Sequence, residues 1–140
     1  MNRREAIRLA KGAAAWLYND DPDFVDAGCS DVSEVIAQFL SQLGVDVKVL
    51  YGWARWGRGE KFMHAWLEIG GERLDPVLWV FRNDLSKYSY KVEPNVAEAL
   101  KVHDPEEEQF RVDELERERR KGRLRPEKPE IPEAEPDYWD

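Results

Sequence analysis

Cysteine is almost missing from this chain of 140 residues, in which Cys29 is the single one. One thiol cannot form an intramolecular disulfide, and a cysteine-rich zinc site is excluded for the same reason. There are two histidines, His64 and His103. A metal site made of Cys29 and both histidines would lack a fourth ligand and the short spacings of metal motifs. We therefore expect neither a metal nor an organic cofactor.

Long apolar runs and an excess of positive charge are missing too. Arg8 and Lys11 interrupt the first apolar stretch and leave residues 13–18 unbroken, which is too short for a signal sequence or a membrane span. The 21 basic and 29 acidic residues give a formal net charge of −8, which argues against sequence-independent binding of nucleic acid. We predict a cytoplasmic protein that binds neither membranes nor nucleic acid.

Most of the acidity lies near the C-terminus. Residues 104–140 hold 14 acidic and 8 basic residues and five of the eight prolines, while residues 1–103 are close to neutral. The length allows one domain. We predict that residues 1–103 form this domain and that residues 104–140 form a charged helix with a proline-rich tail.

The charged helix has clear boundaries in the sequence. Asp104 is suited to cap its N-terminus ahead of Pro105, and Gly122 to end it. Three apolar residues, too few for a core face, lie within it: Phe110, Val112 and Leu115. The favoured interpretation is a solvated appendage. The alternative is an arm ending in Tyr138 and Trp139 that docks on a protein partner.

Apolar spacing predicts two helices in the first third of the chain. Residues 3–17 carry apolar side chains at three- and four-residue intervals, and residues 19–23 end this helix and begin a loop. Residues 29–43 repeat the pattern and stop before Gly44, a residue that favours a helix C-terminus.

Strand patterns follow the second helix. Residues 45–54 alternate between apolar and other side chains, and residues 62–69 and 72–77 suit a hairpin around Gly70 and Gly71. Weaker patterns for more sheet and for a short closing helix lie at 79–81, 88–92 and 94–102. The chain is therefore predicted to be α+β, with N-terminal helices packed on an antiparallel sheet.

Cys29 follows Gly28 at the start of the second predicted helix. Unpaired backbone N–H groups and the positive end of the helix dipole stabilise a thiolate at such a position. The opposing interpretation is an inert packing residue, because free cysteines are commonly buried.

The predicted hairpin brings a histidine close to a carboxylate. With Gly70 and Gly71 as the loop, Glu68 lies opposite Arg73 in a favourable cross-strand pair. The same register places His64 and Asp75 on one face of the sheet as diagonal neighbours. A slip by one residue would separate them.

Together, Cys29, His64 and Asp75 offer a nucleophile, a base and an orienting acid. The chain also resembles the transglutaminase-like superfamily over residues 25–80. The resemblance rests on Gly-Cys at 28–29, VDVKVLYGWA at 45–54, HAWLEI at 64–69 and LDP at 74–76.

This resemblance implies a papain-like core, with Cys29 as nucleophile, His64 as base and Asp75 as orienting carboxylate. It implies acyl transfer on a peptide or amide, either hydrolysis or transamidation, with a peptide or protein as substrate. We assign substrate binding to Trp56 and Trp66. Members of the superfamily also place an oxyanion-hole side chain upstream of the cysteine, for which the candidates are Trp16, Tyr18 and Asn19.

A second function remains open. The chain can instead be a catalytically silent module of the same fold that binds a protein partner through its tail. Thiol reactivity separates the two hypotheses, since a silent module has no need of a reactive cysteine.

Overall fold

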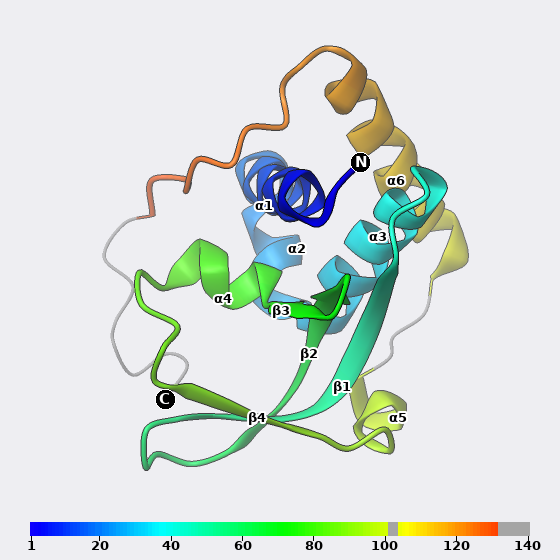
Figure 1. Ribbon diagram of the computed structural model, residues 1–140. Coiled ribbons are helices and arrows are strands. Elements are labelled where there is room, and N and C mark those ends of the chain that lie inside the picture. Colours follow the sequence, from blue (N-terminus) through cyan, green and yellow to red (C-terminus); the bar gives the residue numbers. More distant parts are fainter. Residues whose placement is uncertain (101–103, 132–140) are drawn as a thin grey trace.

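The computed structural model describes residues 1–100 and 104–131 and has an α+β architecture (Figure 1). Its elements are, in chain order, α1 (Arg3–Asp20), α2 (Pro22–Ala27), α3 (Cys29–Gln42), β1 (Val47–Trp56), β2 (Phe62–Ile69), β3 (Glu72–Leu74), α4 (Pro76–Phe81), β4 (Tyr88–Val92), α5 (Val96–Leu100) and α6 (Pro105–Arg120). The predicted helices at 3–17 and 29–43 and the predicted strands at 45–54, 62–69 and 88–92 are confirmed, with small shifts at their ends.

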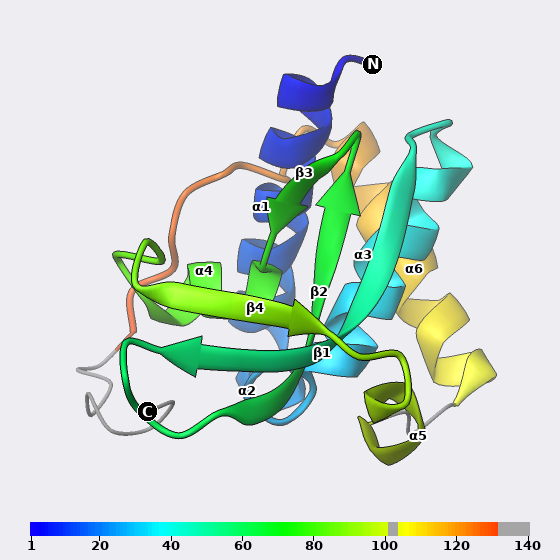
Figure 2. The same cartoon turned by 60° about the horizontal axis from the view of Figure 1, so that its bottom comes forward.

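The four strands form one antiparallel sheet in the order β3-β2-β1-β4. Strand β1 bends along its length, so that the sheet curls (Figure 2). Gly52 allows the close approach of β4 to this strand, because a Cβ atom there would lie 1.9 Å from the Lys91 carbonyl oxygen. A side chain at position 52 would therefore force the two strands apart.

The main core lies between the helices and the sheet. Helix α3 lies at its centre and contacts β1, β2, α1, α4 and α6. Its apolar stripe is fully buried through Val32, Ile36, Phe39 and Leu40. In the described part of the chain, none of the helices combines the length and apolarity needed to cross a membrane.

Helix α6 belongs to this core, which corrects the prediction of a solvated appendage. Val112 and Leu115 are fully buried in the main core, whereas Phe110 is 60% exposed. Two apolar residues three positions apart share one helix face, and that face packs on α3. The predicted domain boundary after residue 103 falls next to residues 101–103, which lie outside the described residues. Tyr138 and Trp139, the predicted end of a docking arm, also lie outside them.

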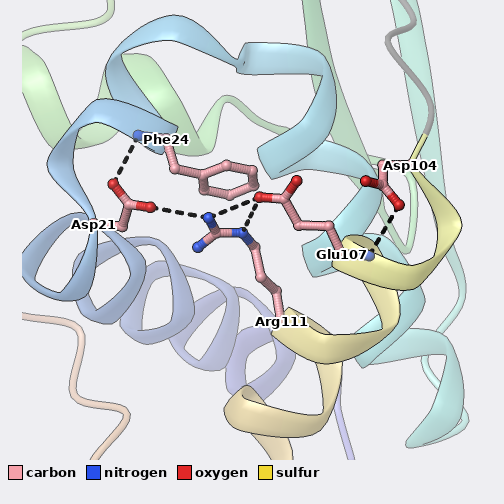
Figure 3. Close-up of polar contacts among 5 residues, drawn as sticks. All are labelled: Asp21, Phe24, Asp104, Glu107 and Arg111. Atoms are coloured by element: carbon pink, nitrogen blue, oxygen red, sulfur yellow. Dashed lines mark hydrogen bonds and ion pairs between the residues drawn. The ribbon is translucent and has the colours of Figure 1, made fainter.

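An ion-pair cluster ties α6 to the corner between α1 and α2 (Figure 3). The Arg111 guanidinium donates to Asp21 at 2.9 Å and to Glu107 at 3.0 Å, and it lies 3.6 Å from the centre of the Phe24 ring. The hydrogen bond from Arg111 lowers the pKa of Asp21. At the other end of the cluster, Asp104 caps α6 as the sequence predicts.

The segment after α6 runs back across α1 toward α4 (Figure 1). Leu124 and Ile131 pack on the core, and the Lys128 ammonium donates to the carbonyl oxygens of Trp79 and Arg82. Residues 121–131 therefore form a strap over the helical layer.

We expect Gly12→Ala to destabilise the protein, although alanine is the better helix former. A Cβ atom at position 12 would lie 2.7 Å from the carbonyl carbon and oxygen of Leu124. The backbone of the strap must then move, at a cost of about 1–3 kcal/mol in the free energy of unfolding. Urea denaturation measures this change. In a chain shortened after Gly122 the substitution should be harmless, and an equal loss there would rule out a clash with the strap.

Three local predictions are wrong, and two prolines, each behind a capping aspartate, explain them. Residues 72–77 do not form one strand, and residues 79–81 are not sheet, because α4 starts at Pro76 behind the Asp75 cap. The region predicted as a loop before Cys29 contains α2, which starts at Pro22 behind the Asp21 cap. Proline lacks an N–H for sheet pairing but suits the first position of a helix.

Candidate active site

Asp75 lies between the end of β3 and the start of α4. Its backbone is extended, and its Oδ1 accepts a hydrogen bond from the Leu78 N–H at 3.1 Å. This bond caps the helix and fixes the rotation of the carboxylate. The side chain is 2% exposed, so its remaining oxygen needs partners inside the protein.

His64 supplies one of these partners. It is the third residue of β2 and is fully buried, and its Nε2 lies 2.6 Å from Asp75 Oδ2. The hairpin register that predicted their proximity is confirmed, because β2 pairs with β3 through Ile69–Glu72, Glu68–Arg73 and Leu67–Leu74. Beyond Leu74 the pairing ends, so Asp75 reaches His64 from the start of a helix and not from a strand.

Tyr90 supplies another partner, which no sequence pattern predicted. Its hydroxyl donates to the same Asp75 Oδ2 at 2.7 Å. Tyr90 lies on β4 opposite Ala54 of β1. The strand pattern at 88–92 placed this tyrosine in the sheet, but nothing in the sequence indicated that β4 pairs with β1 and so lies within reach of Asp75.

Cys29 is the first residue of α3 and is partly buried. The capping position, Gly28, makes no side-chain hydrogen bond to the N–H groups of the first turn, and Asp31 places a carboxylate within that turn. The thiol lies close enough to His64 to affect the titration of the imidazole. Thus the structure brings Cys29, His64 and Asp75 together.

The protonation of His64 follows from its neighbours. Burial lowers its pKa, but the charge and hydrogen bond of Asp75, together with the nearby Cys29 thiol, outweigh burial and raise the pKa to about 10. His64 is therefore an imidazolium at neutral pH. Because Nε2 is bonded to Asp75, and Nδ1 is buried with no partner at hydrogen-bonding distance, Nδ1 is the nitrogen left for the thiol.

A second polar network lies beside Cys29. The Tyr51 hydroxyl donates to Glu34 at 2.6 Å and lies 3.2 Å from the Ser30 hydroxyl. Burial, and then the hydrogen bond to Glu34, raise the pKa of Tyr51, so this hydroxyl keeps its proton. Ser30 and Glu34 both project from the first turns of α3. The network thus anchors the start of α3 to β1.

The predicted substrate-binding tryptophans differ in position. Trp56 is 37% exposed at the end of β1, with the Lys87 ammonium 5.6 Å from the centre of its ring. Trp66 is 2% exposed, and its ring packs against Tyr90 at 4.9 Å between centres. Trp66 therefore supports the site from within, while Trp56 is accessible to a ligand.

The three residues predicted as oxyanion-hole candidates lie in the last turns of α1. Trp16 and Tyr18 pack on the main core, and Tyr18 meets Phe81 edge to face at 5.5 Å between ring centres. Asn19 is exposed. The groups that the structure does place around the thiol are the amides at the start of α3. Within the described ranges, no three His, Cys, Asp or Glu side chains gather as metal ligands would.

No family model matches the chain, and no curated protein is similar to it. A solved structure described as "The crystal structure of genomics APC5867" aligns with 82% of this chain and 78% of its own, with a TM-score of 0.47 and 13% sequence identity. A likeness this distant carries neither a family nor a function over to this chain.

Proposed function

We propose that this protein performs thiol-dependent acyl transfer on a peptide or amide, as a transglutaminase-like protein with a papain-like Cys-His-Asp site. The observation that carries the proposal is the buried His64–Asp75 pair with the Cys29 thiol beside it. An imidazolium held by a carboxylate on one nitrogen favours a thiolate near the other. Simple packing does not require this polarity in a buried site.

The proposed reaction uses these groups in turn. The Cys29 thiolate attacks the substrate carbonyl carbon, and the N–H groups at the start of α3 stabilise the oxyanion. The C–N bond breaks, the amine leaves with the proton of the His64 imidazolium, and a thioester remains on Cys29. Water or a second amine then attacks the thioester, gives its proton to His64, and releases the acyl group.

Asp75 has the orienting role in this scheme. Its contact with Nε2 leaves Nδ1 as the nitrogen that exchanges the proton with the thiol and the leaving group. The substrate is a peptide or protein segment that reaches the partly exposed thiol. Trp56 provides an exposed aromatic surface for it.

Alkylation of Cys29 by iodoacetamide tests the proposal, because the single cysteine makes the mass shift unambiguous. We expect the native protein at pH 6 to react at least tenfold faster than the same chain unfolded in urea, since His64 is still an imidazolium at that pH. His64→Gln should remove this advantage and give a rate that rises steeply toward pH 8.5, the range of an ordinary thiol.

Turnover provides the second part of this test. The wild-type protein, and not Cys29→Ala, should cleave members of a peptide library or attach an added primary amine to them, as read by mass spectrometry. The product identifies water or an amine as the acceptor. A thiol that reacts only after unfolding would contradict the proposal and favour the silent interaction module.

A further inference from the structure

Tyr90 combines three contacts that packing alone does not require. Its ring packs against Trp66, at 4.9 Å between ring centres, and against the Arg73 guanidinium, at 4.1 Å from the ring centre. Its hydroxyl points at the Asp75 carboxylate. The ring is thus held by residues from β2 and β3 while its polar end reaches the buried His64–Asp75 pair.

The hydroxyl is a permanent donor at this position. Burial, and then the charge of Asp75 and the hydrogen bond to it, raise the pKa of Tyr90. The phenol therefore keeps its proton wherever the protein is folded. The carboxylate then accepts the Leu78 N–H on Oδ1 and both the Tyr90 O–H and His64 Nε2–H on Oδ2.

We infer that Tyr90 is a positioning residue of the site, which acts on His64 through Asp75. The inference rests on the proposed function for its effect on the reaction, but its geometry stands without it. The amide of Leu78 fixes one carboxylate oxygen and the hydroxyl of Tyr90 fixes the other. Together they hold Oδ2 at Nε2 of His64, so that Nδ1 stays directed at the thiol.

Tyr90 also sets how strongly Asp75 holds the imidazolium. The Tyr90 hydroxyl and the His64 Nε2–H both donate to Asp75 Oδ2, and each of these two hydrogen bonds weakens the other. Without the hydroxyl, Asp75 becomes a stronger acceptor for His64. The proton is then held more tightly, and the carboxylate is free to turn about its remaining bond to Leu78.

The test is Tyr90→Phe, which keeps the ring contacts with Trp66 and Arg73 and removes only the hydroxyl. We expect alkylation of Cys29 by iodoacetamide at pH 6 to slow about tenfold, the equivalent of one hydrogen bond to a charged group. We also expect the pH at which His64 loses its proton, followed by ¹⁵N NMR of the ring, to move upward. A merely structural tyrosine would not move that titration.

Two controls accompany this variant. Ser89→Ala removes an exposed hydroxyl from the same strand, where it donates to the Arg55 carbonyl oxygen at 3.5 Å, and it should change neither readout. In an Asp75→Asn background, Tyr90→Phe should have almost no further effect on alkylation, because the interaction through which it acts is already gone.

The outcomes separate this inference from the proposed function. An unchanged His64 titration in Tyr90→Phe, with only a lower melting temperature, would overturn the inference. A shifted titration in a protein whose Cys29 proves inert would support the positioning role of Tyr90 while removing the enzymatic proposal.

Discussion

Asp75→Asn is expected to leave the fold intact and to lower turnover of an amide substrate by about 10⁴-fold. The asparagine oxygen can still accept the Leu78 N–H that caps α4. Its amide would donate to Nε2 of His64, which forces the proton to Nδ1 and removes the base at the thiol. Product formation from the peptides found in the library screen measures the effect.

The same substitution changes how stability depends on pH. In the wild type the folded-state pKa of His64, about 10, exceeds the unfolded value of about 6.5, so its contribution to stability is complete below pH 6.5 and is lost as the pH rises toward 10. Without Asp75, burial dominates and this pH dependence should disappear. Urea denaturation at pH 6.5 and pH 9 compares the two proteins.

Asp84→Asn is the matched control for the loss of a carboxylate. Asp84 is exposed and accepts a hydrogen bond from the Ser86 N–H at 2.9 Å, away from the buried pair. The Asp84→Asn variant should retain both full turnover and the wild-type dependence of stability on pH. If Asp75→Asn instead loses stability at every pH but keeps its turnover per folded molecule, then Asp75 is a structural residue.

Leu115→Ala is expected to lower the free energy of unfolding by about 2–5 kcal/mol. Leu115 is fully buried where α6 meets the main core, and truncation leaves a cavity there. Because small domains are stable by about 5–15 kcal/mol, this one substitution removes a large part of the total. Urea denaturation followed by far-UV circular dichroism measures the loss.

Phe110→Ala is the control on the same helix, since it removes a larger side chain that is 60% exposed. Its effect should stay within about 0.5 kcal/mol. If Leu115→Ala is as mild as Phe110→Ala, or if a chain shortened after residue 100 retains full stability, then α6 does not contribute to the core as the structure indicates.

Local signals in the sequence predicted most of the fold. The helix at 29–43, the strand at 62–69 and the capped start of the C-terminal helix at Asp104 depend on neighbours within a few residues. The errors fell on aspartate-proline pairs. The sequence pattern placed Asp75 in a strand and Asp21 at the end of a helix. In the structure each of them caps a short helix that starts at the following proline.

The candidate site was predicted in part, because His64 and Asp75 are joined by a short hairpin. Two glycines at 70 and 71, both with positive φ, set the register, and the register brings the two side chains together. Tyr90 could not be predicted in the same way. Its contact with Asp75 depends on β4 pairing with β1, which no turn between the two strands specifies.

The sequence by itself determined the lone thiol, the absence of a disulfide, the apolar stripe of α3 and the hairpin that pairs β2 with β3, since each depends on composition or on neighbouring residues. Only the tertiary structure decided that Val112 and Leu115 complete the core, that Arg111 reaches Asp21, and that Tyr90 reaches Asp75. These contacts join segments far apart in the chain. Their energy comes from burial and charge pairing between surfaces that a local pattern does not bring together.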